Sequence, residues 1–522
     1  MQGKNSNIPI KSSRKLASSL KYTSPNQLTF DGFETPFEQK LTKENRWVKL
    51  CNLIPWDTIV GLYDNQFKSK EGRPPINGRI VIGAVIIKHM LDLTDRETIL
   101  QIQENMFMQY FLGFSSFTNE EVFDPSLFVD IRERLNLSIT TAISEIIVKH
   151  HIERVPEFKT QEKNDSNTKD NDLENKTQDT HKGTLLMDAT VAPQNITFPT
   201  DLKLLNASRV KSEEIIDKLY DKSIHGEVKP RTYRELARKD FLNTNKKKRK
   251  SHKEIKEANG KQLQYLKRNI AHINILIKGY EDAQKETPLK KRLKEYFEVI
   301  KLVYQQQNYM QENGVNSVEN RIVNIHQAHV RPIVRGKEGV KVEFGSKHHL
   351  SLIGGFSFID KLEWNAFNES TCLKDSIEKY KERFKFYPKK VLIDRIYCTR
   401  ENRKYLSELG IELQAKPLGR PRKEAVSNHI SPGERNPVEG KFGQAKTAYG
   451  MDNICAKLKT TSESWIGSIV LVLNLVKLMR LIPLWIKLKI IKIKKCINIF
   501  YELFSQNFIF IQNRKNYEIY CF

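Results

Sequence analysis

Two short apolar runs, far apart in the chain, are each followed directly by an aspartate. They are Leu185–Met187 before Asp188 and Val391–Ile393 before Asp394. Short apolar runs bounded by polar residues are typical of buried strands. A carboxylate at the end of a buried strand costs free energy unless something uses its charge. We therefore expect a sheet with two strands that stop at Asp188 and Asp394.

A third stretch, Arg435–Lys446, is predicted to form a helix that carries Glu439 between two cations. Two Asp and one Glu, brought together by folding, form an oxygen-only ligand set that suits Mg²⁺ or Mn²⁺. Each residue taken alone has an ordinary alternative. Asp188 is then a turn residue at a strand end, Asp394 an N-cap of the next helix, and Glu439 a partner in helix salt bridges.

Four histidines offer a second, weaker metal candidate: His326, His329, His348 and His349. No cysteine and no carboxylate motif accompanies them, so the spacing of a zinc site is missing. The six cysteines contain no C-x-x-C pair, and neither a zinc site nor a disulfide framework is expected.

The chain between the two aspartates is predicted to be largely helical from 201 to 307. Its apolar residues alternate three and four apart, first at Leu263, Leu266, Ile270, Ile273, Ile277 and Tyr280, then from Leu289 to Val303. This spacing is an a/d seam and predicts two long antiparallel helices. The basic run Lys246–Lys250 before them is either a solvated loop or a phosphate contact.

The first part of the chain, from about Phe33 to Ser138, has helical periodicity. Thr94 and Glu97 form a capping-box pattern directly after the apolar run that ends near Leu91. Two helices joined by such a short turn are compatible with a DNA-reading helix-turn-helix, although an ordinary helical hairpin is the simpler interpretation. The segment 157–183 is almost devoid of apolar residues and marks a domain boundary.

The second half alternates strand and helix patterns. A hairpin through Gly354-Gly355, a helix over 372–386, the Asp394 strand, a helix over 400–409 and a strand over 411–415 follow one another. This order predicts an α/β fold with a central sheet covered by helices.

Composition indicates the partner. The 522-residue chain has a formal net charge of +25 and a pI near 9.5, which favours a polyanion, although a lysine-rich coding background explains part of the charge. The N-terminus has no signal-peptide pattern, so we expect a cytoplasmic protein. Cations interrupt the apolar C-terminal region, so no membrane span is expected there.

These residues resemble a known family. The order Asp188, Asp394, Glu439 is similar to the DDE catalytic core of the RNase-H-like transposases of bacterial insertion sequences. Arg435, Glu439 and Lys446 fit the pattern Arg, three residues, Glu, six residues, Lys of a cut-and-paste subgroup. Further stretches resemble the same subgroup: Gly72–Pro75, Tyr110–Gly113, Val330–Lys337, Leu418–Pro421 and Val438–Gly443.

The resemblance implies an α/β fold: an RNase-H-like mixed sheet flanked by helices, with a long helical insertion after the first strand and an all-α N-terminal domain. The expected divisions are a flexible basic arm (1–32), a DNA-binding domain (33–153), a polar linker (154–183), the first part of the core (184–200), the insertion (201–310), the remaining core (311–478) and a basic amphipathic tail (479–522).

The implied function is a transposase that binds the ends of its insertion sequence, cleaves them and joins the 3′ ends to target DNA. Asp188, Asp394 and Glu439 are the expected catalytic residues and ligands of two Mg²⁺ ions, for which Mn²⁺ can substitute. Arg435, Lys446, Arg395 and Lys441 are the expected DNA contacts. The expected partners are the terminal inverted repeats, target DNA and a second copy of the chain in a homodimer, in a nucleoid-associated bacterial setting without a membrane.

Two positions depart from the pattern. Many relatives have Tyr three residues before the motif Arg, where this chain has Pro432, and Lys after the second Asp, where it has Arg395. A nuclease of the same fold without strand transfer and a DNA-binding remnant without catalysis remain as alternatives.

Overall fold

The computed structural model describes residues 41–67, 75–151, 181–335, 342–415 and 435–481. The expected arm (1–32), most of the expected linker (154–183) and most of the expected tail (479–522) lie outside these residues. So do Gly72–Pro74, Leu418–Pro421 and Pro432.

The N-terminal part is helical. Its elements are α1 (Arg46–Leu53), α2 (Trp56–Asp64), α3 (Gly78–Leu91), α4 (Asp95–Glu104), α5 (Met106–Leu112), the 3-10 turn η3 (Pro125–Leu127), α6 (Phe128–Arg134) and α7 (Leu137–His151). The Thr94 hydroxyl accepts the Glu97 N–H, as the capping pattern predicts. Residues Gly78–Met90 of α3 are all buried, so α3 is a core helix without a free face for reading DNA.

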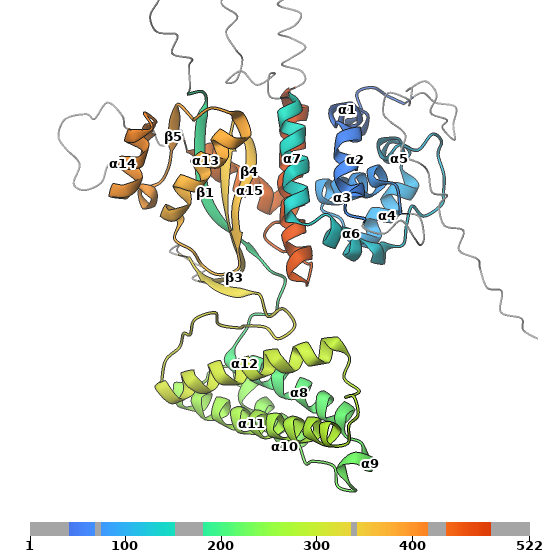
Figure 1. Ribbon diagram of the computed structural model, residues 1–522, viewed down its shortest axis with the longest axis vertical. Coiled ribbons are helices and arrows are strands. Elements are labelled where there is room, and N and C mark those ends of the chain that lie inside the picture. The colour runs from blue at the N-terminus through green and yellow to red at the C-terminus, as the bar shows by residue number, and fades with distance from the viewer. Residues whose placement is uncertain (1–40, 68–74, 152–180, 336–341, 416–434, 482–522) are drawn as a thin grey trace, which may run out of the picture.

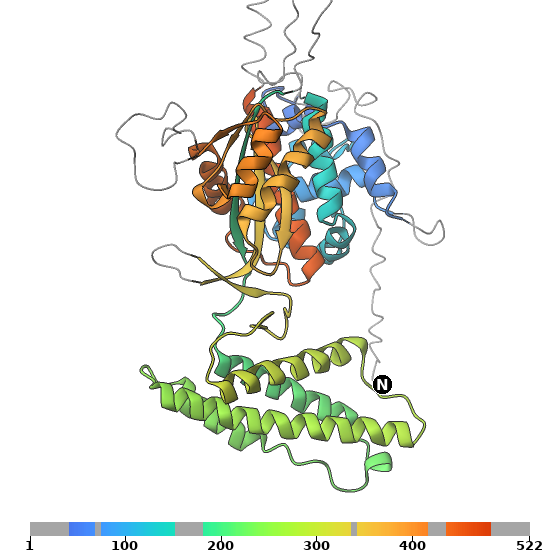
Figure 2. The same cartoon turned by 60° about the vertical axis from the view of Figure 1, so that its left-hand side comes forward.

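The predicted helices between the two aspartates are present. They are α8 (Asp201–Leu219), α9 (Lys222–His225), α10 (Arg234–Asn245), α11 (His252–Asp282) and α12 (Lys291–Asn313). Along the predicted seam, Leu263, Leu266, Ile273 and Tyr280 are buried, and Ile270 and Ile277 pack against them. These helices have a hydrophobic core of their own and lie below the sheet (Figures 1 and 2). We call α8 to α12 the helical insertion.

A mixed sheet forms the other half. Its strands are β1 (Thr184–Pro193), β2 (Arg331–Val334), β3 (Val342–Ile353), β4 (Phe356–Glu363), β5 (Lys390–Leu392) and β6 (Glu412–Gln414). The order is β2-β3-β1-β5-β6, with β4 also paired to β3. Strands β1, β5 and β6 run parallel, whereas β3 is antiparallel to its neighbours. The fold is therefore mixed α/β.

Two details of the sheet differ from expectation. Strand β1 does not stop at Asp188 but continues to Pro193, because β3 pairs with it as far as Gly345. The short strand β2 was not expected as a strand. The predicted hairpin is confirmed: Gly354 and Gly355 have φ angles of 57° and 83°, which suit glycine, between β3 and β4.

Helices pack on the sheet. They are α13 (Cys372–Phe384), α14 (Arg400–Glu408), α15 (Asn436–Tyr449) and a helix over Lys459–Leu481, with 3-10 turns η6 (Glu369–Thr371) and η7 (Arg395–Tyr397). Helix Lys459–Leu481 lies beside α7, between the sheet and the N-terminal helices (Figure 1). Its Asn474 amide donates to the Ser144 hydroxyl of α7 at 2.9 Å and to the Ser357 carbonyl of β4 at 2.8 Å.

In the part of the chain that is described, Lys459–Leu481 is the one helix long and apolar enough to cross a membrane by length and composition. Most of its apolar stretch is buried inside the protein. Here it acts as a core helix.

A buried ionic network also ties α7 to the sheet. Arg383 of α13 donates to Glu145 of α7 at 2.7 Å and to Asp360 of β4 at 2.8 Å. Asp360 also accepts the Ser351 hydroxyl and lies 3.8 Å from Nδ1 of His349. We call Glu145, Arg383, Asp360 and His349 the α7–sheet network.

Candidate active site

The sheet register brings the two aspartates to the same level. In the parallel pair of β1 and β5, Leu186 lies opposite Leu392. Asp188 and Asp394 each follow two residues later, and side chains two apart in a strand project to the same face. The two carboxylates therefore lie at the same level of the β1–β5 pair and on one side of the sheet.

A single guanidinium connects them. Nη2 of Arg435 lies 3.2 Å from Oδ2 of Asp188, and Nη1 lies 3.3 Å from Oδ1 of Asp394. Arg435 stands at the N-cap of α15, which packs on β1, and its side chain is 13% exposed. One half-buried cation thus pairs with two acids that are 206 positions apart in sequence.

Burial is the main influence on Asp188. It raises the pKa of the Asp188 carboxyl, against the opposing effects of the Ala189 N–H, at 2.8 Å, and of Arg435. The negative charges of Glu369 and Asp394 raise the pKa further. A carboxylate in this position gains from any additional positive charge.

Asp394 has the local role that its ordinary alternative predicts. Its Oδ1 accepts the Arg395 N–H at 2.8 Å, so it caps the 3-10 turn η7. The cap uses one of the two carboxylate oxygens, and the Asp394 side chain is 47% exposed. Asp394 can therefore cap the turn and still offer an oxygen to a cation. The Arg395 side chain is exposed.

Glu439 is on α15, as the sequence predicts, one helical turn beyond Arg435, and it is exposed. The structure brings Asp188, Asp394 and Arg435 together. Among the described residues, no three or more His, Cys, Asp or Glu side chains are grouped closely enough to hold a metal ion. Glu439 therefore does not complete a three-carboxylate cluster in this arrangement.

The donor set nevertheless fits a hard divalent cation. Both aspartates offer carboxylate oxygens to one shared positive charge, and Mg²⁺ and Mn²⁺ prefer oxygen ligands. In this structure Arg435 supplies that positive charge.

The other expected DNA contacts have surroundings of their own. Nζ of Lys446 is 3.9 Å from Oε1 of Glu343 on β3. Lys441 is half-buried, and its pKa is lowered to about 8 by burial and by the nearby charges of Lys477 and Arg480. Of the four expected cations, Arg435 alone pairs with the two aspartates.

Two residues near the site were not anticipated. Glu369 of η6 is close enough to raise the pKa of Asp188, and it pairs with Lys347 at 2.9 Å. Tyr397, three residues after Asp394, is fully buried, and its hydroxyl has no hydrogen-bond partner among the described residues. No sequence motif surrounds Glu369, so nothing in the sequence places it at the site. Tyr397 could have been predicted as a neighbour of the site, because it lies three residues after Asp394 in the sequence.

The histidines do not form a metal site in the described chain. His349 belongs to the α7–sheet network, and burial lowers the pKa of His348 to about 3. Nδ1 of His326 lies 2.8 Å from the Tyr296 hydroxyl, and His329 packs edge-on against Trp364.

Arg435→Ala is expected to tighten divalent-cation binding by about tenfold or more, because the competing guanidinium is removed from between two carboxylates. Titration with Mn²⁺, followed by electron paramagnetic resonance, measures the change directly. Arg435→Lys, which retains the charge, should restore most of the competition. Arg400→Ala, which removes an exposed cation from α14, is the control. Equal Mn²⁺ affinity in parent and Arg435→Ala would contradict the competition.

Two segments match families of known proteins. Residues 391–476 match the family described as "Transposase DDE domain", and residues 35–134 match the "Transposase domain (DUF772)". The first segment contains Asp394, Arg435 and Glu439, whereas Asp188 lies outside both.

Among curated proteins, the chain is similar to the uncharacterized protein ORF8 in the nfe locus of Rhizobium meliloti, with 30% identity over 105 residues. The alignment covers 20% of this chain and 50% of the relative, so the chain spans about half of that protein's length. No solved structure matches the chain.

Proposed function

Because the chain belongs to the DDE-type transposases of insertion sequences, we propose that it binds the ends of its element, cleaves them and joins the 3′ ends to target DNA. The observation that carries the proposal is the pair Asp188 and Asp394, which adjacent parallel strands bring to one cation. Two convergent carboxylates are the usual arrangement for metal-assisted phosphodiester chemistry.

In this proposal, Asp188 and Asp394 hold Mg²⁺, with Glu439 as the third carboxylate and Mn²⁺ as a substitute. Two bound ions would activate the attacking oxygen and stabilise the leaving oxygen of the phosphodiester. Arg435 holds the two aspartates in position before the metal arrives and is then available to a phosphate oxygen. Burial around Asp188 strengthens the electrostatic contacts of that carboxylate.

The same proposal covers the finer fold and the division of the chain. An antiparallel half, β4-β3-β1, that continues into a parallel half, β1-β5-β6, supports an RNase-H-like core. The proposed divisions are those expected from the sequence, with 33–153 as the DNA-binding domain and 201–310 as the insertion. Arg395, Lys441 and Lys446 are proposed DNA contacts, in a homodimer acting in a nucleoid-associated, cytoplasmic setting.

The test uses duplex DNA that carries the inverted repeats flanking the gene. A transposase should nick this duplex in the presence of Mg²⁺ and join its 3′ end to a second duplex, giving a product longer than either substrate. A nuclease without strand transfer would give cut ends only. No cleavage beyond that of an Asp188→Asn, Asp394→Asn double variant would overturn the proposal and favour a remnant.

A further inference from the structure

The strongest concentration of positive charge lies in the helical insertion, away from the aspartates. Between residues 231 and 253 there are ten Lys and Arg and two acidic residues, whereas the whole chain has 87 Lys and Arg in 522 residues. A lysine-rich coding background would spread cations evenly, so it does not explain this excess.

The structure fixes this charge on one surface. Helix α10 packs on α8 and α11, with Ala237 fully buried at the contact. The Gln262 amide of α11 donates to the Ala237 carbonyl at 2.9 Å, and the Tyr265 hydroxyl donates to Asp240 at 2.9 Å. These contacts hold α10 against α8 and α11, and residues on its opposite face are exposed.

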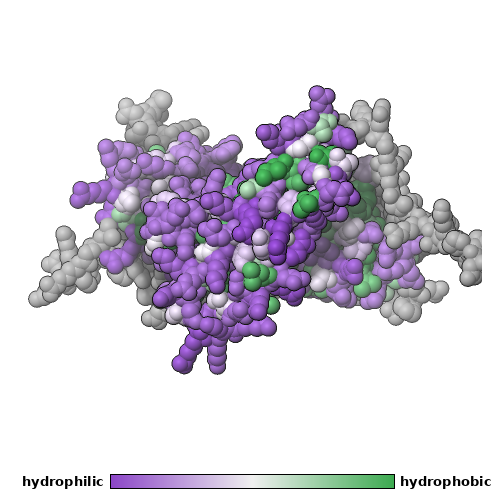
Figure 3. Space-filling view, turned by 90° about the horizontal axis from the view of Figure 1, so that it is seen from below, coloured by the Kyte–Doolittle hydropathy of each residue, from purple (hydrophilic) through white to green (hydrophobic). Residues whose placement is uncertain are grey.

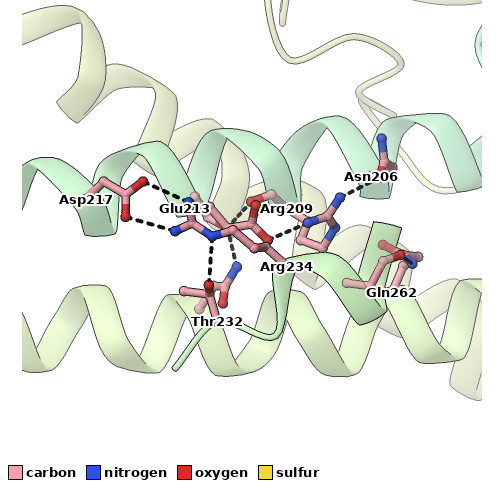
Figure 4. Close-up of polar contacts among 10 residues, drawn as sticks. Asn206, Arg209, Glu213, Asp217, Thr232, Arg234 and Gln262 are labelled. Carbon is pink, nitrogen blue, oxygen red and sulfur yellow. Dashed lines mark hydrogen bonds and ion pairs between the residues drawn. The ribbon is translucent and has the colours of Figure 1, made fainter. Parts of the chain in front are cut away.

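On the side of α10 that faces α8, the carboxylate of Asp217 already has cationic partners. Figure 4 shows Arg234 forked onto Asp217 of α8, at 2.8 and 3.1 Å, with Thr232 beside it. Lys229 also pairs with Asp217, at 2.7 Å. Asp217 is thus paired with Arg234 and Lys229 and does not compensate the cations on the outer face of α10.

The outer cations form a ridge with no carboxylate partner among the described residues. Its members are Arg238, Lys239, Lys246, Lys248, Arg249 and Lys250, all exposed. We call these six residues the α10 ridge. Arg238, Lys239 and Lys246 line an open groove of about 470 Å³, together with Leu242, Asn243 and Glu235. Arg238 and Lys239 lie on α10, Lys246 is its C-cap, and the other three follow in the loop before α11. Neighbouring unpaired cations repel one another, and this repulsion is relieved when a polyanion binds.

The surrounding surface argues against an apolar partner. Figure 3 views the molecule from below, the side on which the insertion lies in Figure 1, and the visible face is mostly hydrophilic with small, separate apolar spots. Nearby, the Tyr233 side chain is 38% exposed. The guanidinium carbons of Arg231 and Arg268 lie 4.6 and 4.5 Å from the centre of its ring. A clustering of Lys and Arg on one surface is typical of nucleic-acid-binding proteins.

We propose that the α10 ridge is a second DNA-docking surface, which grips the phosphate backbone of a duplex without reading its sequence. The inference rests on the proposed function for the choice of duplex DNA as the polyanion. Its chemistry is charge neutralisation by Lys and Arg, which positions a duplex but carries no base recognition.

The test compares two triple variants of the full-length protein. Arg238→Gln/Lys239→Gln/Lys246→Gln alters the ridge. Lys290→Gln/Lys291→Gln/Lys294→Gln is the matched control, because these exposed lysines lie at the start of α12, on a different helix. Binding to a labelled duplex of arbitrary sequence is measured over a range of salt concentrations. Each phosphate contact contributes about 0.9 to the slope of log K against log salt.

The ridge variant is expected to bind at least tenfold more weakly at low salt and to lose about 2 to 3 units of slope, while the control keeps the parent's slope. A ridge variant that binds like the control overturns the proposal. Ridge-dependent binding that is tighter to single-stranded RNA or to phosphatidylserine vesicles than to duplex DNA also overturns it. If the ridge variant fails to fold, Lys248→Gln/Arg249→Gln/Lys250→Gln replaces it, since these residues lie in the loop between α10 and α11.

Failure of the ridge and failure of the proposed function are distinguishable in one experiment. Mg²⁺-dependent nicking by the parent, together with unchanged binding by the ridge variant, overturns only the ridge. Weakened binding by the ridge variant, together with no nicking by the parent, overturns only the transposase chemistry.

Discussion

Glu439→Gln should abolish Mg²⁺-dependent cleavage and strand transfer while DNA binding survives. The substitution keeps the size and hydrogen bonding of the side chain but removes the charge of the carboxylate that we propose as the third metal ligand. Loss of a metal ligand removes several kcal/mol of transition-state stabilisation, so nicking should fall by about a thousandfold or more. Nicking of an end-containing duplex measures the loss, and a filter or gel assay measures binding.

Glu401→Gln is the matched control, since Glu401 is an exposed carboxylate on the neighbouring helix α14. It should cleave at the parent's rate. Parental nicking by Glu439→Gln would mean that the third carboxylate has been misassigned, and Glu369, whose charge reaches Asp188, would be the next residue to replace.

Arg383→Met should destabilise the protein by about 3–5 kcal/mol, because it leaves the Asp360 and Glu145 carboxylates without their shared cation. Arg383 and Asp360 are almost fully buried, so solvent cannot replace the lost contacts. Urea unfolding followed by circular dichroism measures the change. Lys381→Met, two residues earlier and exposed, should change stability by less than about 0.5 kcal/mol.

The same network predicts acid sensitivity. Burial alone would raise the pKa of Asp360, but His349, Arg383 and the Ser351 hydroxyl together bring it well below its usual range. A lowered pKa in the folded state means that the stabilisation is fully present above the unfolded-state pKa of about 3.9 and is lost as the pH falls below it. Arg383→Met should lose much less stability between pH 5 and strongly acidic solution than the parent. Equal acid losses would contradict this role of Asp360.

Local patterns in the sequence predicted much of the fold. The a/d spacing around Leu266 and Ile273 predicted the insertion helices, and Gly354-Gly355 predicted the β3–β4 hairpin. The expected helix with Glu439 is α15. These features depend on periodicity, capping and glycine conformation within one segment, which a single sequence contains.

Contacts between segments that are far apart in the chain were harder to predict from the sequence. Strand β1 passes through Asp188 because its length is set by β3, whose partner residues lie about 160 positions later. Arg435 was expected to contact DNA, yet its two partners in the structure are aspartates on other elements. Glu369 reaches the site only because η6 packs against η7. None of these contacts leaves a local signature.

The position of the insertion has a consequence for how the chain is made. Strand β1 leaves the ribosome long before either of its neighbours, since Leu185 pairs with Ile353 on one side and Val391 on the other. Until β3 and β5 are synthesised, an apolar strand has both edges unpaired, which favours aggregation. The helical insertion, with its own core and mostly local contacts, can fold during this interval and bring the ends of the future sheet near each other. Folding of the mixed sheet should therefore be the slow, chaperone-sensitive step, completed only when the last third of the chain has emerged.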